Sequence, residues 1–203
     1  MTERQGLDVR VHSEDEARPL LEAGGRLVRL GHDMVAMTAN ALDPPNFANG
    51  LRAVGCADVD VNDLVCAAAQ ATPVEHVDAA IWQRVDRTAH WRSILGSAHE
   101  RLVDDASRVV LDEGGAVVAA AVVSHKLPLR WWPGGSWLQE IFVVPRSQGR
   151  GIGGALLNHA LWGSRVNGEA CMGLTVTEGN PAERLYRRLG FVRFRSTWQI
   201  TEP

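Results

Sequence analysis

Cysteine is scarce in this sequence, and its spacing does not fit a disulfide framework or a metal site. The 203 residues include Cys56, Cys66 and Cys171 and no C-x-x-C pair, which predicts reduced, mostly packed thiols. The seven histidines form no H-E-x-x-H pattern, so we expect no metal. The longest uncharged apolar run, residues 116–123, is far shorter than the roughly 20 residues of a membrane span.

A strong charge of either sign is absent too. The formal net charge of −3 gives no general attraction to nucleic acid or to an anionic membrane, and we expect neither partner. The opening residues, MTERQGLDVR, contain no apolar stretch, so we expect a cytoplasmic protein rather than a secreted one. The composition, 45% hydrophobic and 22% charged, is typical of a globular protein with one good core.

What the sequence does contain is a glycine-rich stretch between an expected strand and an expected helix. The apolar run 137–144 predicts a buried strand that Pro145 ends. Residues 149–154 then include four glycines, and apolar residues recur at helical spacing over 155–161. Such glycines allow close approach to the backbone and leave the first helix amides without partners. Together with the Arg150 side chain, they predict an anion site suited to phosphate.

Residues 1–50 differ in pattern from the rest, and we expect them to form an N-terminal extension to a domain over 51–203. The extension either packs on that domain or contributes to a homodimer. It is expected to contain a strand over 8–12, a helix capped by Ser13 that stops at Gly24-Gly25, strands over 26–30 and 34–42 joined by a turn at Gly31-His32-Asp33, and a linker at 43–46. One helix over 26–41 is the alternative to the two strands.

The rest of the chain predicts an α/β protein with a mixed sheet. The expected strands cover 51–54, 107–112, 116–125, 171–177 and 191–200, the last as one strand or two. The expected helices follow a cap at Asp58 or Asp60, run from Thr72-Pro73 to about Leu95, and extend from Asn180-Pro181 to Leu189. Residues 127–135 are expected to form an irregular loop, in which Trp131 and Trp132 either wall an acceptor pocket or cover the core.

Two motifs in the second half resemble those of the GNAT superfamily of N-acetyltransferases. The first is V-V-P followed by Q-G-R-G-I-G, from Val143 to Gly153, and the second is N-P-A-E-R-L-Y-R-R-L-G-F, from Asn180 to Phe191. Their occurrence in this order, with a strand between them, is a specific signal. The resemblance covers residues 51–200 and implies the GNAT acyl-CoA N-acyltransferase fold, a mostly antiparallel sheet that splays in the middle and is flanked by helices.

The resemblance also implies a site and a reaction. Acetyl-CoA is the expected co-substrate, without a metal, and its acetyl group would pass directly to a primary amine in a ternary complex. Its pantetheine arm would pair with backbone groups of residues 142–144 and contact Asn180, its pyrophosphate would rest on amides of 149–154, and Tyr186 would act as general acid for the thiolate. The residues expected to bind the cofactor are Phe142, Val143, Val144, Gln148, Gly149, Arg150, Gly151, Gly153, Gly154, Asn180 and Tyr186.

Amine chemistry explains why a base is expected as well. An alkylammonium with a pKa near 10.4 is only about one part in 2,500 neutral at pH 7, a cost of roughly 4.6 kcal/mol. Glu140, on the central strand, is the candidate base, acting directly or through water. A strand carboxylate that is paired with an arginine, or simply solvated, is the alternative for Glu140. A tyrosine packed under the sheet is the alternative for Tyr186, the one tyrosine in the sequence.

Other functions stay open at this point. The string G-x-G-x-x-G over 149–154 also fits a dinucleotide-binding turn, although residues 145–148 separate it from the strand. A CoA-binding regulatory module and an assembly module without turnover are further alternatives. The acceptor, a small-molecule amine or a protein amine, is not specified by any motif.

Overall fold

The computed structural model describes residues 8–43, 47, 50–96 and 101–201. The strands are β1 (Asp8–Val11), β2 (Arg26–Met37), β3 (Arg52–Val54), β4 (Arg108–Leu111), β5 (Val117–Lys126), β6 (Gly135–Val143), β7 (Cys171–Thr177) and β8 (Val192–Thr201). The helices are α1 (Glu14–Glu22), α2 (Val61–Ala71), α3 (Ala79–Trp82), α4 (Arg87–Gly96), α5 (Ile152–Val166) and α6 (Glu183–Arg188).

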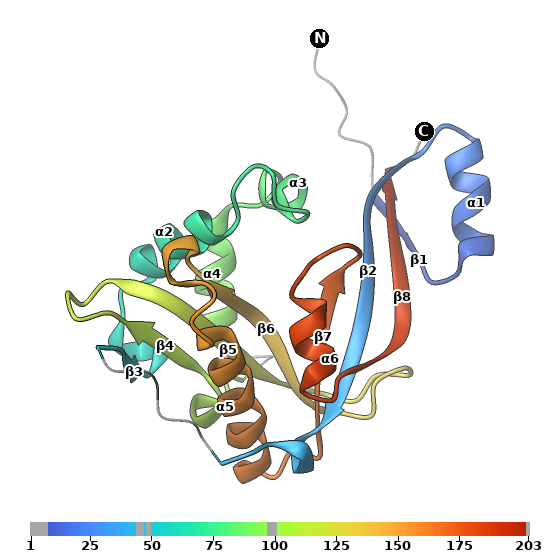
Figure 1. Ribbon diagram of the computed structural model, residues 1–203. Coiled ribbons are helices and arrows are strands. Elements are labelled where there is room, and N and C mark those ends of the chain that lie inside the picture. Colours follow the sequence, from blue (N-terminus) through green and yellow to red (C-terminus); the bar gives the residue numbers. More distant parts are fainter. Residues whose placement is uncertain (1–7, 44–46, 48–49, 97–100, 202–203) are drawn as a thin grey trace.

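The strands form one eight-stranded sheet in the order β1-β8-β2-β7-β6-β5-β4-β3 (Figure 1). The β6–β7 pair is parallel, and the other neighbouring strands pair antiparallel. This mixed, mostly antiparallel sheet confirms the predicted fold class. It also excludes the dinucleotide-binding alternative, because that fold has an open, mostly parallel sheet.

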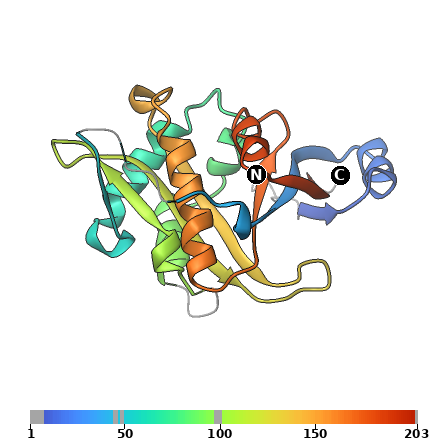
Figure 2. The same ribbon diagram turned by 60° about the horizontal axis from the view of Figure 1, so that its bottom comes forward.

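Helices cover both faces of the sheet around β5. Successive side chains of a strand point to opposite faces, and residues 117–124 of β5 are all buried. Both α5 and α2 pack on β5, and Figure 2 shows α5 lying across the front of the sheet. The sequence accounts for this double burial, since β5 reads VVAAAVV without a charged residue before His125.

The sheet opens between β6 and β7, as the resemblance implied. These strands pair only at Ser136–Met172, Trp137–Gly173 and Leu138–Leu174, and beyond that point they diverge (Figure 1). The register between β5 and β6 shifts at the same level, with Val123 opposite Leu138 and Val122 opposite Glu140. The shift leaves Gln139 as an extra residue, and a bulge of this kind bends the strand that carries it.

The prediction of two strands joined at Gly31-His32-Asp33 is wrong, and so is the alternative of one helix. β2 continues through these residues and pairs with both β7 and β8. The polar side chains that suggest a turn have partners across the strands. The His32 ring bonds Ser196 and Glu178, and the Asp33 carboxylate accepts a hydrogen bond from Thr175.

The single helix expected from Thr72-Pro73 to Leu95 is also wrong. Thr72 instead ends α2, which Asp60 caps as expected. Residues 73–78 form turns before the four-residue α3, and Asp86 accepts a hydrogen bond from the Ala89 amide as a new helix starts. An aspartate at such a position favours a helix start, so it divides the apolar pattern into two helices.

The N-terminal residues belong to the same sheet as the rest. Ser13 caps α1 in a capping box with Glu16, which confirms the predicted helix start. β2 lies inside the sheet, between β8 and β7. A domain boundary at residue 50 stays a prediction, and the linker expected at 43–46 lies outside the described residues except for Asp43.

Candidate functional site

The glycine corner, residues 148–154, lies between the end of β6 and the start of α5. Gly149 and Gly151 have φ of 75° and 79°, backbone conformations that favour glycine. A Cβ added at either position would meet nothing within 4 Å. Gly151 is the N-cap of α5, with no side-chain hydrogen bond to the helix. The corner therefore presents the first amides of a fifteen-residue helix beside open space, which suits an anion.

The corner is held against β6. The side-chain Nε2 of Gln148 donates to the carbonyl oxygen of Val143 at 2.9 Å. The backbone N–H of Val144, just before the corner, donates to the carbonyl oxygen of Val118 on β5 at 2.8 Å. A Cβ at Gly153 would lie 3.6 Å from Val143 and 3.5 Å from Leu185 of α6. The structure thus brings together the corner, the last residues of β6 and α6, which are the three segments that the two motifs identified.

Arg150 is exposed and lines an open cavity of about 370 Å³, together with Asp112 and Glu113. Its contribution to an anion site stays a prediction.

Tyr186 lies on α6 and is 6% exposed. Its ring packs against Phe191, with 6.1 Å between the ring centres. Burial raises the pKa of the phenol well above its usual range, and the carboxylates of Asp78 and Glu140 raise it further. The phenol is therefore protonated throughout the neutral range, and two carboxylates from other segments lie near it.

Asn180 connects the start of α6 to the turn before α3. Its Oδ1 accepts a hydrogen bond from the Ala182 amide at 2.9 Å, and its Nδ2 donates to Asp78 Oδ2 at 3.1 Å. Thr177, at the end of β7, also donates to Asp78 and accepts a hydrogen bond from Arg29 Nε at 2.8 Å. Sequence reasoning missed Asp78, because the single helix expected from Thr72-Pro73 to Leu95 makes it an interior position.

Glu140 is held by a histidine. His90 Nε2 of α4 lies 2.8 Å from Glu140 Oε1, and the Glu140 side chain is 19% exposed. The His90 ring in turn packs edge-on against Trp82, with 5.0 Å between the ring centres. Neither the arginine pair nor the solvated carboxylate that the sequence left open describes this residue.

A cavity of about 380 Å³ lies on the part of the sheet formed by β1, β8, β2 and β7. Arg29, Asp33 and Thr175 line it from the strands, and Trp131 and Trp137 form an indole wall. Trp132, by contrast, is 1% exposed and packs edge-on against Trp137. Trp132 therefore packs in the interior, and the expected role of Trp131 in a pocket wall stays a prediction. Sequence reasoning missed the strand residues of this cavity, because they gather only through long-range pairing.

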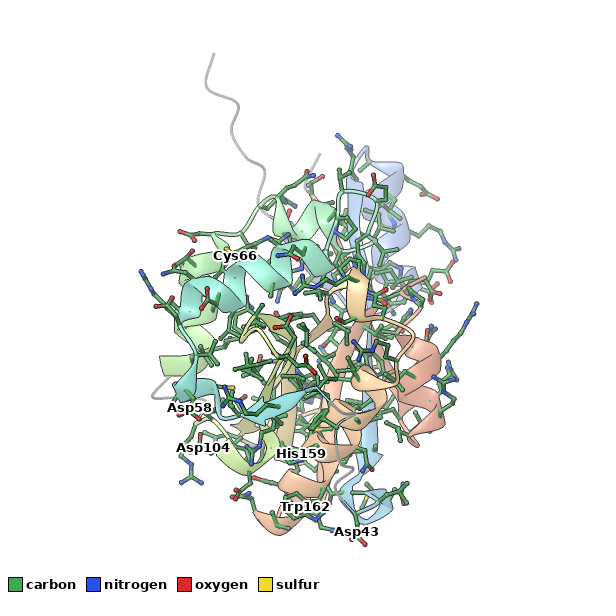
Figure 3. All side chains as sticks on the ribbon, turned by 60° about the vertical axis from the view of Figure 1, so that its left-hand side comes forward. Asp43, Asp58, Cys66, Asp104, His159 and Trp162 are labelled. Atoms are coloured by element: carbon green, nitrogen blue, oxygen red, sulfur yellow. The ribbon has the colours of Figure 1, made fainter. Side chains whose placement is uncertain are left out.

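The described part of the chain contains no group of three or more metal-ligating side chains, and none of its helices has the length and apolar character of a membrane span. All three cysteines are free. Figure 3 shows Cys66 on α2, and His159 and Trp162 on α5.

Known proteins share the domain and the fold. Residues 104–193 match the family model of the acetyltransferase (GNAT) domain. The streptothricin acetyltransferase of Streptomyces lavendulae is 34% identical over 89 residues, which are 43% of this chain and 45% of that protein. The match thus spans less than half of that relative's length.

Two solved structures show the same fold at low identity. A GCN5-related N-acetyltransferase from Sphaerobacter thermophilus superposes with a TM-score of 0.68 at 19% identity, covering 98% of this chain and 61% of that one. One from Kribbella flavida has a TM-score of 0.55 at 17% identity, covering 98% and 68%. Both motifs lie within the matched residues. Residues 104–193 therefore match a GNAT acetyltransferase domain, within a fold that solved GCN5-related N-acetyltransferases share.

Proposed function

We propose that this chain transfers the acetyl group of acetyl-CoA directly to a primary amine in a ternary complex. The observation that carries the proposal is the gap between β6 and β7, which opens beyond Leu138 and Leu174 beside the glycine corner. A pantetheine arm fits such a gap as a short added strand, since β6 there is not paired with β7. The amides at the start of α5 would hold the pyrophosphate.

The chemical step then needs two groups from the chain. The amine nitrogen attacks the thioester carbonyl carbon, the carbon–sulfur bond breaks, and the amine proton passes to Glu140 directly or through water. The Tyr186 O–H would donate to the departing sulfur. Because the pKa of the phenol is raised and that of a thiol is about 8.5, Tyr186 stabilises the thiolate chiefly by hydrogen bonding. Complete transfer of its proton is the less favourable route.

The two buried thiols of the chain, Cys56 and Cys171, favour direct transfer over an acyl-enzyme. Burial raises the pKa of Cys56 to about 11. Burial and the nearby Glu169 raise the pKa of Cys171 as well, and the Cys171 sulfur bonds the Gly134 carbonyl oxygen. The thiolate, not the thiol, is the nucleophile, so neither buried cysteine is prepared to accept an acetyl group.

Calorimetry with acetyl-CoA and a thiol-release assay test this proposal together. We expect saturable binding of acetyl-CoA and release of CoA that depends on an added amine. The amine panel includes streptothricin, the substrate in the name of the curated relative. Binding without release on any amine would point to a regulatory module, and absence of binding would leave an assembly role, with residues 1–50 as its docking segment or dimer surface.

Replacing Glu140 by glutamine tests the base. We expect kcat/KM to fall about 10²-fold near pH 7, within the range typical of general-base catalysis. The loss should shrink as the pH approaches the pKa of the acceptor, about 10.4 for an alkylamine, because the amine is then neutral without help. The measurement is a pH profile of thiol release at saturating acetyl-CoA.

Glu169→Gln is the matched control for this change. Glu169 also bonds a histidine, His125, and its side chain is 16% exposed against 19% for Glu140. If both variants lose the same activity, or if the Glu140→Gln loss is independent of pH, Glu140 is a structural carboxylate and not the base.

A further inference from the structure

The cavity on the β1-β8-β2-β7 part of the sheet carries an excess of positive charge. Four of its lining side chains are cationic, Arg10, Arg29, Lys126 and Arg195. Among the described lining residues, Asp33 is the one carboxylate. Asp33 is already engaged, since it accepts a hydrogen bond from Thr175 at 2.7 Å and lies 3.7 Å from Arg195. Counting the arginines alone, three guanidinium groups thus face one carboxylate in the described lining.

The indole wall holds two of these cations in place. The Arg195 guanidinium lies 4.1 Å from the centre of the Trp131 ring, and the Lys126 ammonium lies 3.6 Å from that of Trp137. Stacking on an indole orients a cation without neutralising it. Held this way, the Arg195 guanidinium keeps its capacity to attract an anion in the cavity.

The positive charges of Arg10 and Arg195 also lie apart from the negative charges of Asp78 and Glu140. Arg29 donates a hydrogen bond to Thr177, which in turn donates one to Asp78. The negative charges of Asp78 and Glu140 also raise the pKa of the Tyr186 phenol and counteract the lowering of the Arg29 pKa by burial. Carboxylates thus gather beside the proposed reaction centre. Arg10, His12 and Arg195 come from β1, its following turn and β8, farther along the sheet in the order of the strands.

From this arrangement we infer that the acceptor is a small molecule that carries an anionic group, a carboxylate or a phosphate, in addition to the amine that is acetylated. The inference rests on the proposed function. The ammonium form of the amine would approach the carboxylate end, and the anion would bind near Arg195 and Arg10. The volume, about 380 Å³, lies in the range of roughly 300–1,000 Å³ typical of small-molecule sites.

Matched pairs of amines test the inference. The probes are phosphoethanolamine against ethanolamine for phosphate, and an amino acid against its amide for carboxylate. We expect the anionic member of at least one pair to react with a kcat/KM about tenfold higher. It should also bind more tightly in calorimetry with the CoA-loaded protein, a readout that does not need turnover. The pair with the larger preference identifies the anion.

A charge variant adds a second readout. Arg10 is exposed on β1, so Arg10→Gln should fold normally and reduce the preference for the anionic amine about fivefold, chiefly through KM. Arg18→Gln is the control, because Arg18 pairs with Glu14 and Asp15 on α1 and does not line the cavity. It should leave the preference unchanged.

The outcomes separate this inference from the proposed function. Equal or better binding and turnover of the neutral amines, or no binding of any of the four probes, would overturn the inference. If only the neutral amines are acetylated, the inference about an anionic acceptor is overturned while the proposed function stands. Anion-selective binding without any thiol release would keep the inference about the cavity and count against acetyl transfer.

Discussion

Gly151→Glu is expected to abolish acetyl-CoA binding while the chain remains folded. A side chain at Gly151 would meet no protein atom within 4 Å, so the substitution does not disturb packing. It places a carboxylate in the open space in front of the first amides of α5, where the pyrophosphate is proposed to lie. The helix N-terminus would then face a resident negative charge, and the phosphates would be repelled. Calorimetry should show a loss of affinity of at least about 10²-fold.

Gly168→Glu provides the matched control for this prediction. Gly168 follows the other end of α5, is exposed, has φ of 82° against 79° for Gly151, and also has open space around an added Cβ. Both variants therefore carry the same new charge and a similar backbone strain, of order 1 kcal/mol. Similar melting temperatures with a loss of binding only in Gly151→Glu are the expected result. Retained binding in Gly151→Glu would mean that the corner does not hold the phosphates.

Features encoded by neighbouring residues could be predicted from the sequence. The Ser13 capping box, the Asp60 cap and the strand β5 follow from signals within a few residues. The glycine corner is of the same kind, because its positive φ angles and its uncapped helix start need only the residues of the loop itself. The two motifs are local too, which explains why the fold class could be named from one half of the chain.

Features that depend on distant partners could not be predicted in this way. Gly31-His32-Asp33 has the composition of a turn, and only Thr175, Glu178 and Ser196, far along the sequence, make a strand of it. Asp78 likewise accepts hydrogen bonds from Thr177 and Asn180, which are about a hundred residues away in the sequence. The cavity lined by Arg10, Arg29 and Arg195 combines side chains from both ends of the chain. The position of the proposed acceptor site therefore becomes visible only in three dimensions.

Tyr186→Phe is expected to lower kcat about 10²-fold, the typical effect of removing one hydrogen-bond donor to a developing anion. The affinity for acetyl-CoA should stay nearly unchanged, because the phenylalanine ring keeps the packing against Phe191 and only the hydroxyl is lost. Thiol release at saturating substrates measures kcat, and calorimetry measures the affinity. An unaltered kcat would remove Tyr186 from the reaction.

The raised pKa of Tyr186 gives this variant an independent structural check. Burial and the carboxylates of Asp78 and Glu140 hold the proton on the native phenol to a higher pH than in the unfolded chain, where it leaves near pH 10. Above about pH 10 the unfolded state therefore binds fewer protons, and the free energy of unfolding of the wild type falls as the pH rises. Tyr186→Phe lacks this contribution, so its stability should fall less over the same range. If both proteins respond alike, the pKa of the phenol is not raised in the folded state, and Tyr186 is not buried beside the carboxylates of Asp78 and Glu140.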